Sequence, residues 1–427
     1  MARAKKETAL TPEERLQAAL VPDWEWPYKL PENWCWTYFK SISTIQTGKK
    51  DANYGSDEGK YPFFTCAAES IRCHGYSFDC RAILLAGNGD INNISRYNGK
   101  FEAYQRTYVV KIAEPLCFDY IFYWFKYRWF DFNKGKMFGT AIPYIRLGNL
   151  QEFPTPIPPL AEQQRIVDRI ESLFAKLDEA KEKAQAVVDS FETRKAAILH
   201  KAFTGELTAK WREEHGVSID NWKTTRFDSV AAIRSNLVDP AEYQSFPHIA
   251  PDNIEKKTGV LLEYHTIAED GVTSGKHRFY SGKILYSKIR PYLSKAVVVD
   301  FDGLCSADMY PIEAYQNARC LWYYMLSDEF LLQASTAGSR SVLPKINQKE
   351  LSALTVHLPT NDREQEEIAR ILDELFDKEQ QTKEAAEIVL DQIDLMKKSI
   401  LARAFRGELG TNDPSEESAV ELLKRVL

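Results

Sequence analysis

Residues 202–207 read Ala-Phe-Thr-Gly-Glu-Leu, and residues 404–409 read Ala-Phe-Arg-Gly-Glu-Leu. These endings close two longer stretches, residues 163–207 and residues 365–409, which align without a gap and are identical at 18 of 45 positions. A gapless repeat of this size indicates that its length is constrained, which is typical of a rod rather than of a loop. Two unrelated amphipathic surface helices, the alternative, would have no reason to share both a length and an ending.

Apolar residues in both stretches alternate at spacings of four and three, the pattern that lets helices supercoil in pairs. The first series is Ile166, Ile170, Leu173, Leu177, Ala180, Ala184, Val187, Phe191 and Ile198, broken by Arg194. The second is Ile368, Leu372, Leu375, Ala386, Val389, Ile393, Met396 and Ile400, broken by Glu379 and Thr382. Gly205 and Gly407 stand where a left-handed C-cap is expected, and Asp362 is the expected N-cap of the second helix.

The order along the chain is globular part, helix, globular part, helix. Two similar units in tandem should pack about a pseudo-twofold axis, which makes the two helices antiparallel and sets the globular parts toward opposite ends of a spacer. We therefore expect an α+β fold, with two globular mixed α/β domains separated by a pair of long antiparallel coiled-coil helices. The expected boundaries are an N-terminal segment with a short helix (1–30), the first globular domain (31–159), the first helix (160–215), the second globular domain (216–359), the second helix (360–410) and a C-terminal tail (411–427).

Composition fits such a protein. The 427 residues are too many for one core, and no run approaches the roughly 18–20 apolar residues of a membrane span. Seven scattered cysteines and a polar N-terminus without a signal peptide favour a cytoplasmic protein with free thiols. The net charge of −6 argues against a nucleic-acid partner, but residues 362–427 alone carry −7 and the rest of the chain +1, and binding depends on local charge.

Local patterns place further elements. Residues 11–14, Thr-Pro-Glu-Glu, predict a helix that runs to about Leu20. Residues 34–39 and 82–85 are predicted strands, and residues 103–112 alternate like a third. Residues 118–132 contain ten aromatics in fifteen positions; a helix or strand in the core is favoured over a platform for stacked bases. The second globular domain is a diverged counterpart of the first, since residues 221–222 answer residues 33–34 and residues 341–346 answer residues 141–145.

Residues 273–295 are the strongest candidate for nucleic-acid binding, because they carry seven basic or histidine side chains, interleaved tyrosines and no acid. A solvated basic face is the alternative. The candidate DNA-binding residues of the second domain are Lys276, Arg278, Lys283, Lys288, Arg290, Lys295, Arg340 and Lys345. Those of the first domain, where the pattern is weaker, are Asn88, Arg96, Lys100, Arg106, Lys134 and Lys136.

No pattern in the chain predicts catalysis. Cys66, Cys73, His74 and Cys80 invite a zinc site, but their spacing does not match structural zinc motifs. Residues 251–257 superficially resemble a nuclease motif, and we interpret them as a turn. Phosphate-binding loops, amino-methyltransferase motifs, the serine-hydrolase elbow and the His-Glu-x-x-His motif are absent from the sequence. We therefore expect neither a catalytic residue nor a metal.

Four motifs carry a resemblance. Residues 158–167 read Pro-Pro-Leu-Ala-Glu-Gln-Gln-Arg-Ile-Val, residues 205–212 Gly-Glu-Leu-Thr-Ala-Lys-Trp-Arg, residues 282–291 Gly-Lys-Ile-Leu-Tyr-Ser-Lys-Ile-Arg-Pro and residues 399–409 Ser-Ile-Leu-Ala-Arg-Ala-Phe-Arg-Gly-Glu-Leu. With them the chain resembles, over essentially its whole length, the specificity subunits of type I restriction-modification systems. It departs at residues 361–365, Asn-Asp-Arg-Glu-Gln, where the family has Pro-Leu-x-Glu-Gln.

The resemblance implies a non-catalytic DNA-recognition subunit. Each globular domain would be a target recognition domain that reads half of a bipartite double-stranded DNA target, and the helices would set the unread gap. The conserved regions would dock two methyltransferase (modification) subunits, which carry S-adenosylmethionine and methylate adenine, while restriction subunits add ATP-driven translocation; S-adenosylmethionine, ATP and Mg would all sit on partners, and no cofactor is expected on this chain. The residues expected at the subunit interface are Gln163, Phe203, Gly205, Gln365, Phe405 and Gly407.

Three alternatives stay open from the sequence. The first is a free-standing two-headed DNA-binding or regulatory protein, which should bind its target tightly without partners. The second is an enzyme in its own right, such as a nuclease. The third is a coiled-coil scaffold that binds only protein.

Overall fold

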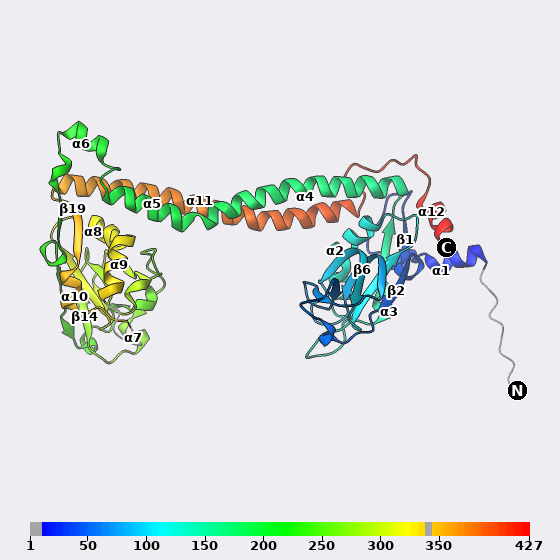
Figure 1. The fold of residues 1–427 in the computed structure, drawn as a ribbon, viewed down its shortest axis with the longest axis horizontal. Helices are drawn as coiled ribbons and strands as arrows, with labels where there is room; N and C mark the ends of the chain where they lie inside the picture. The colour runs from blue at the N-terminus through cyan, green and yellow to red at the C-terminus, as the bar shows by residue number, and fades with distance from the viewer. Residues whose placement is uncertain (1–10, 338–343) are drawn as a thin grey trace. The chain divides into compact units, whose positions relative to one another are not determined.

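The computed structural model describes residues 11–337 and 344–427, which form two compact units (Figure 1). Unit 1 contains residues 11–183 and 389–427, and unit 2 contains residues 184–337 and 344–388. Each unit therefore holds one globular domain and a part of each long helix, so that a unit is not one half of the sequence.

The globular domain of unit 1 is built on a six-stranded sheet with the strand order β2-β7-β5-β6-β3-β4. All neighbours in it are antiparallel except β3 and β6. The strands are β2 (Ser43–Thr47), β3 (Tyr61–Phe64), β4 (Ile71–Cys73), β5 (Phe78–Ala86), β6 (Ile94–Ala103) and β7 (Thr107–Ile112), and a separate antiparallel pair is formed by β1 (Cys35–Tyr38) and β8 (Pro154–Ile157). The strands expected at 34–39 and 82–85 are thus present, whereas the stretch 103–112 divides between the end of β6 and β7.

The aromatic-rich stretch forms helix α2 (Phe118–Asn133), which packs the core of unit 1. Tyr120, Trp124, Phe125 and Trp129 on this helix are fully buried. The prediction of a core element is confirmed, and these rings are not available as a stacking platform. The short helix α3 (Leu147–Gln151) completes the domain.

The globular domain of unit 2 contains two sheets. Their strand orders are β10-β18-β15-β16 and β11-β14-β17-β12-β13. The strands are β10 (Ala231–Ile233), β11 (Leu237–Val238), β12 (Pro247–Ile249), β13 (His265–Thr266), β14 (Lys276–Phe279), β15 (Ile284–Ser287), β16 (Ala296–Val298), β17 (Gly303–Cys305) and β18 (Met309–Ala314), and β9 (Trp222–Arg226) pairs antiparallel with β19 (Thr355–Pro359). The helices are α6 (Ala209–His215), α7 (Ile267–Asp270), α8 (Ala318–Met325), α9 (Asp328–Ala337) and α10 (Gln348–Ala353).

The two domains share a frame. The order β10-β18-β15-β16 repeats β2-β7-β5-β6, and the β9–β19 pair repeats the β1–β8 pair. The parallel strand pair of the first domain, β3 and β6, has a counterpart in the parallel strand pair β12 and β17 of the second domain. The second domain differs by the strand β11, which forms one edge of its five-stranded sheet. This difference agrees with the expectation that the frame is duplicated while the interiors have diverged.

The long helices are α4 (Leu160–Asp189), α5 (Phe191–Phe203) and α11 (Asp362–Ala404). In unit 1 the Lys181 ammonium lies 3.5 Å from the Asp394 carboxylate, and Lys397 bonds Asp178, so α4 and α11 run antiparallel there. In unit 2 the guanidinium of Arg194 on α5 lies 2.7 Å from the Glu379 carboxylate on α11, and the Lys383 ammonium on α11 lies 4.9 Å from the centre of the Phe191 ring on α5, so these helices also run antiparallel. The polar breaks in the two apolar series thus face and neutralise each other.

Two details of the helices differ from expectation. The first rod is not one helix, because α4 ends at Asp189 and α5 begins at Phe191. The Ser190 hydroxyl donates to the Ala186 carbonyl at 2.6 Å, and Arg194 donates to the Val187 carbonyl at 3.2 Å, so side chains compete for the carbonyls of that turn. The N-cap of α11 is Asn361, whose side chain accepts from the Arg363 amide at 3.0 Å; the expected cap, Asp362, is the first helical residue.

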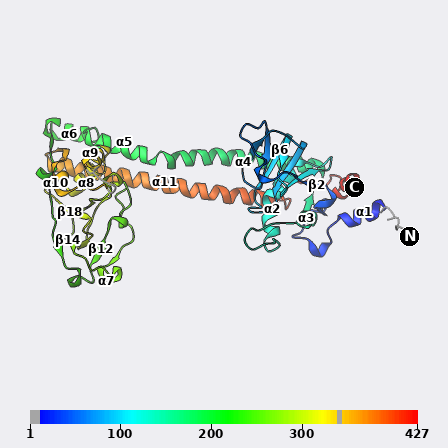
Figure 2. The same cartoon turned by 60° about the horizontal axis from the view of Figure 1, so that its bottom comes forward.

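The ends of the described chain belong to unit 1. Helix α1 (Pro12–Ala19) begins at Thr11 with a capping box, as expected. Residues 411–427, expected only as a tail, contain helix α12 (Ala419–Val426), which lies beside α1 in both views (Figure 1, Figure 2). Leu422 and Leu423 of α12 are buried in the core of this unit. The spacing of the apolar residues at 419, 422, 423 and 426 was a helix signal in the sequence.

Candidate nucleic-acid interface

In unit 2, two backbone segments pair beyond the end of β15 and form a surface that we call loop pair 2, residues 288–290 with residues 344–346. The Arg290 amide donates to the Pro344 carbonyl at 2.8 Å, and the Ile346 amide donates to the Lys288 carbonyl at 2.9 Å. The side chains of Lys288 and Lys345 both approach the carboxylate of Asp308, at 3.7 and 3.0 Å. The structure therefore brings together three of the predicted residues, Lys288, Arg290 and Lys345.

Arg290 is held in the left-handed region of backbone space, with φ +48° and ψ +61°. This conformation is costly for residues other than glycine, on the order of 1 kcal/mol or more, and the exposed side chain gains no burial from it. The backbone is fixed on both sides, because its amide donates to Pro344 and its carbonyl accepts from the Leu293 amide at 2.9 Å. A cation is thus presented from a rigid, strained loop.

Unit 1 has the same feature at the end of β5, and we call it loop pair 1, residues 87–89 with residues 143–145. The Gly89 amide donates to the Pro143 carbonyl at 2.8 Å, and the Ile145 amide donates to the Gly87 carbonyl at 2.9 Å. Gly89, with φ +73°, takes the position that Arg290 takes in unit 2. The two stretches that the sequence suggested separately, one glycine-rich and one basic, are one structural site in two versions.

Arg106 joins loop pair 1, because its carbonyl accepts from the Gly87 amide at 2.8 Å, as the Asp308 carbonyl accepts from Lys288 at 3.0 Å in unit 2. The structure therefore brings together the predicted residues Asn88 and Arg106. Sequence reasoning missed Arg146, whose guanidinium lies 3.9 Å from the centre of the Phe138 ring next to this loop pair. The sequence could have indicated Arg146 through its position, because it directly follows residues 143–145, which correspond to residues 344–346 of the second domain.

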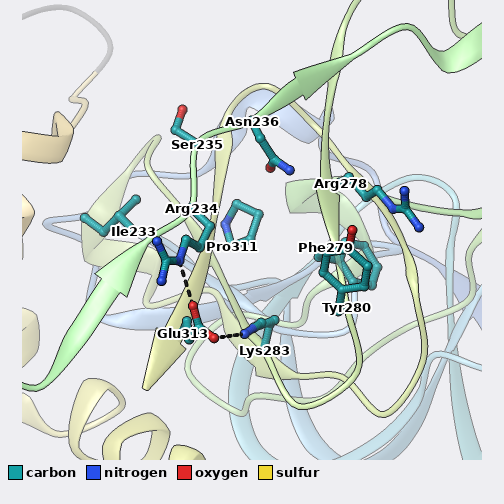
Figure 3. A pocket seen from close by; sticks show the side chains of 10 residues that line it. All are labelled: Ile233, Arg234, Ser235, Asn236, Arg278, Phe279, Tyr280, Lys283, Pro311 and Glu313. Carbon is teal, nitrogen blue, oxygen red and sulfur yellow. Dashed lines mark hydrogen bonds and ion pairs between the residues drawn. The ribbon is translucent and has the colours of Figure 1, made fainter. Parts of the chain in front are cut away.

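A second basic feature of unit 2 is a cavity of about 450 Å³ between β10, β14 and β18 (Figure 3). At its base the Glu313 carboxylate bonds both Arg234 and Lys283, each at 2.6 Å. Arg278 stands at the other side, with its guanidinium 4.8 Å from the Tyr280 ring and 5.3 Å from the Tyr243 ring. The predicted residues Arg278 and Lys283 share this cavity, and Arg234 and Asn236 were missed because they lie outside the basic run.

The other cations of the basic run are turned inward. Lys276 is buried, its ammonium donates to Ser274 at 2.7 Å, and burial lowers its pKa. Lys295 donates to the Pro251 carbonyl at 2.6 Å. Lys288 donates to the Ala307 carbonyl, and burial together with the neighbouring Lys345 lowers its pKa. These three lysines stabilise loops, so Arg278, Arg290 and Lys345 are the cations best placed for a ligand.

The remaining predicted residues of unit 1 are spread over the domain. Arg96 bonds Asp119 and lies 4.8 Å from the centre of the Phe122 ring. Lys100 lies 4.8 Å from the Tyr76 ring, whose hydroxyl raises the pKa of that lysine. Lys134 and Lys136 are exposed just beyond α2. The structure does not bring these four residues into one patch with Asn88 and Arg106.

The predicted interface glutamines clamp each helix to its own domain. Gln163 accepts from the Cys117 amide at 2.8 Å and donates to the Pro158 carbonyl at 3.0 Å. Gln365 accepts from the Asn317 amide at 3.2 Å and donates to the Pro359 carbonyl at 2.7 Å. Both are buried within the chain, so the structure gives them an intramolecular role, and their contact with a partner stays a prediction.

A buried carboxylate precedes each glutamine. Glu364 accepts from Arg212 at 2.7 Å and from the Trp222 indole at 3.0 Å, and it also bonds Thr208 and Asn221. Glu162 accepts from Thr411 at 2.7 Å and from Arg165 at 2.9 Å. Each carboxylate ties the start of one long helix to the segment that follows the other.

The repeated endings have the same geometry in both units. Gly205 and Gly407 have φ of +81° and +74°, which confirms the predicted left-handed caps. A side chain at Gly407 would place its Cβ 2.5 Å from Pro31, which explains the need for glycine. Phe203 and Phe405 are buried under these caps.

Within residues 11–337 and 344–427, no group of three His, Cys, Asp or Glu side chains is arranged to hold a metal ion. Over the same residues, no helix combines the length and the apolar character that crossing a membrane requires. Arg340, a predicted DNA-binding residue, lies outside the described residues.

Comparisons with known proteins decide the family. The sequence profile of the type I restriction modification DNA specificity domain matches twice, at residues 31–188 and 219–389. The chain belongs to that family. It is similar to the specificity subunit of the type I restriction enzyme EcoDI from Escherichia coli, with 39% identity over 93% of this chain and 95% of the relative. The two profile matches agree with the two domains that share one frame.

Solved structures support the fold of this specificity-family chain. The crystal structure of an HsdS subunit from Thermoanaerobacter tengcongensis aligns with a TM-score of 0.57 and 18% identity, over 90% of this chain and all of that one. A chain from a study of complex assembly and conformational transition of the type I R-M system aligns with a TM-score of 0.64 and 19% identity, over the same shares. The α+β fold with two domains and a helical linker is therefore that of the family.

Proposed function

We propose that this chain is the DNA-recognition component of a type I restriction-modification complex, that each globular domain reads one half of a bipartite target, and that the chain itself is not a catalyst. Family membership supports the DNA partner. Its modification and restriction subunits, and a cytoplasmic site of action, are proposed on the same ground.

The observation that carries the proposal is the strained arginine of loop pair 2. An exposed guanidinium offers parallel donors that match the acceptors of guanine in the major groove, and the fixed backbone presents this side chain at the cost of strain, which is typical of functional positions. The matching site of loop pair 1 has Gly89 beside Asn88, whose amide can both donate to and accept from adenine. The two domains would thus read different bases from equivalent loop pairs, with side chains one position apart.

The cavity of Figure 3 supplies the second element of the unit 2 reader. Arg278 is oriented by aromatic rings rather than by an acid, which leaves its charge available to a phosphate or a base edge. Glu313 neutralises only Arg234 and Lys283. The proposed DNA-binding set is therefore Arg278, Arg290 and Lys345 in unit 2 and Asn88, Arg106 and Arg146 in unit 1.

The test is Arg290→Gly, assayed as the complex with its modification subunits on DNA that carries either half-site altered. Glycine accepts the left-handed backbone, so the stability of unit 2 should be unchanged or raised by up to about 1 kcal/mol. Discrimination at one half-site should fall by about 1–3 kcal/mol while the other is unaffected. Lys223→Ala, which removes an exposed cation from β9 of the same unit, is the control and should change neither.

Equal effects on both half-sites, or no effect on either, would contradict the assignment of unit 2 as a separate reader. The same assay distinguishes the proposed function from a free-standing regulator, because a regulator would bind the full target as tightly without modification subunits as with them. Methyl transfer by the purified chain alone, given S-adenosylmethionine, would contradict its non-catalytic role.

A further inference from the structure

Unit 2 contains a groove of about 360 Å³ between the end of α5 and the start of α9. Its wall on α5 includes Leu199, His200 and Phe203, and its opposite wall includes Ser327, which precedes α9, together with Asp328 and Glu329 of the first turn of α9. The backbone at Phe203 lies where the helix ends, and Asp328 and Glu329 are exposed. None of these residues belongs to the proposed DNA-binding set.

The same place in unit 1 is filled. The match between the units is set by one ring pair: Trp124 lies 5.0 Å from Phe405, and Tyr324 lies 5.0 Å from Phe203, both edge to face. Three residues further along, unit 1 has Tyr127, whose ring stacks on Phe405 at 5.7 Å and 11°. The corresponding residue of unit 2 is Ser327, which leaves that space empty.

A second side chain covers the helix end in unit 1. The Tyr28 hydroxyl donates to the Phe405 carbonyl at 2.9 Å, and the Arg406 guanidinium lies 5.6 Å from its ring. Tyr28 lies in the segment before β1. A different segment of unit 1, the one that follows α11, bonds Glu162 through Thr411. In unit 2, the connection from α5 to β9 plays the part of that latter segment, since Thr208 bonds Glu364.

We propose that the groove of unit 2 binds a tyrosine-bearing segment of a protein partner, in which a basic residue adjoins the tyrosine. The ring would lie against Phe203 in the space that Tyr127 fills beside Phe405 in unit 1. The Phe203 carbonyl, whose counterpart at Phe405 accepts from Tyr28, would accept a hydrogen bond from the hydroxyl of this ring. Asp328 and Glu329 are exposed on the rim of the groove and carry two negative charges, so the groove of unit 2 favours a positive neighbour. This proposal does not depend on the reading of DNA.

A peptide copied from the first unit of this chain can test the groove of unit 2. A labelled peptide of residues 21–31, Val-Pro-Asp-Trp-Glu-Trp-Pro-Tyr-Lys-Leu-Pro, places Lys29 directly after Tyr28. We expect saturable binding to the full-length chain by fluorescence anisotropy, and at least about tenfold weaker binding when the peptide carries Tyr28→Ala, because buried aromatic anchors dominate such contacts.

Ser327→Tyr in the protein restores the ring of unit 1 and should abolish binding by filling the groove. Ser327→Ala is the matched control: both changes remove the hydroxyl that donates to the Tyr324 carbonyl at 2.7 Å and accepts from the Phe330 amide at 3.4 Å, but alanine leaves the groove open and should keep binding. Glu329→Lys is an independent variant on the exposed rim, which should weaken binding of the peptide and regain it with a Lys29→Glu peptide.

Three results would contradict binding of the peptide in this groove. Absence of binding to the unaltered chain overturns the proposal. Undiminished binding to a folded Ser327→Tyr protein overturns it too, because the peptide would then be exchanging with Tyr28 in unit 1 or binding elsewhere. If Ser327→Tyr does not fold, the charge exchange at Glu329 carries the test, and failure of the Lys29→Glu peptide to regain binding refutes the groove as the site.

Discussion

Replacement of Glu364 by Gln should destabilise unit 2 more than replacement of Glu162 by Gln destabilises unit 1. Both carboxylates are fully buried, but their arginine partners differ: the side chain of Arg212 is 11% exposed and that of Arg165 is 39% exposed. In Glu364→Gln, Arg212 keeps its charge without a counter-ion, and breaking such a buried pair costs about 3–5 kcal/mol. The amide oxygen can still accept from Trp222, so we expect about 3 kcal/mol.

The matched change in unit 1 leaves Arg165 with another partner, the Glu416 carboxylate at 2.8 Å. A partly exposed pair of this kind contributes about 1 kcal/mol or less. For a domain of this size each kcal/mol shifts the melting temperature by about 2–4 °C, so Glu364→Gln should lower the transition of unit 2 by about 6–12 °C and Glu162→Gln should lower that of unit 1 by about 2–4 °C.

Calorimetric unfolding of the full-length chain at neutral pH measures both shifts. A second change, Arg212→Met, should recover much of the stability that Glu364→Gln loses, because it removes the unpaired charge. The reasoning is refuted if the two glutamine variants lose the same stability, or if Arg212→Met makes Glu364→Gln worse by its own full cost.

Two further predictions follow from the same contacts and from the helix pair. Burial raises the pKa of Glu364, but hydrogen bonds from Arg212, Asn221, Trp222 and Thr208 outweigh it and hold the pKa below the ordinary value of 4.5. The stabilisation from Glu364 is therefore complete above pH 4.5 and is lost as the pH falls through the lower folded-state pKa. The difference in unfolding free energy between the unaltered chain and Glu364→Gln should accordingly shrink as the pH falls below about 4.5 in denaturant titrations. The second prediction inserts one heptad into α4 after Lys183 and one into α11 after Ala386, which adds about 10 Å of helix. At about 3.4 Å per base pair, the unread gap should lengthen by about 3 base pairs while both half-sites stay unchanged, as measured by methylome sequencing. A four-residue insertion in α4 alone should instead break the apolar seam between the helices and destabilise the protein.

The repeat made the architecture predictable. The antiparallel direction of the helices within each unit and the left-handed caps at Gly205 and Gly407 follow from periodicity and from the shared endings. These features depend on local spacing, which a single sequence displays. The break at Ser190 was not predictable, because it depends on where the Arg194 side chain turns in three dimensions.

The site was predictable only in part, because charge along a strand does not reveal which side chains face inward. Lys276 and Lys295 looked like Arg278 and Arg290 in the sequence, yet their ammonium groups donate to the backbone carbonyls of Ser274 and Pro251. The equivalence of Gly89 and Arg290 was hidden for another reason: the residues differ in chemistry, and only the backbone pairing with Pro143 and Pro344 shows that they share a position.

Unit 1 is assembled from the two extremes of the chain, whereas unit 2 is one continuous run from Ala184 to Ile388. Domains normally complete in order from the N-terminus during synthesis. Here the order is reversed, because Glu162 and Arg165 can contact Thr411 and Glu416 only after all of unit 2 has been translated. The half of the molecule that is translated first is therefore the last to acquire its full set of contacts, and a nascent chain that stalls late would present a finished unit 2 beside an unclosed unit 1.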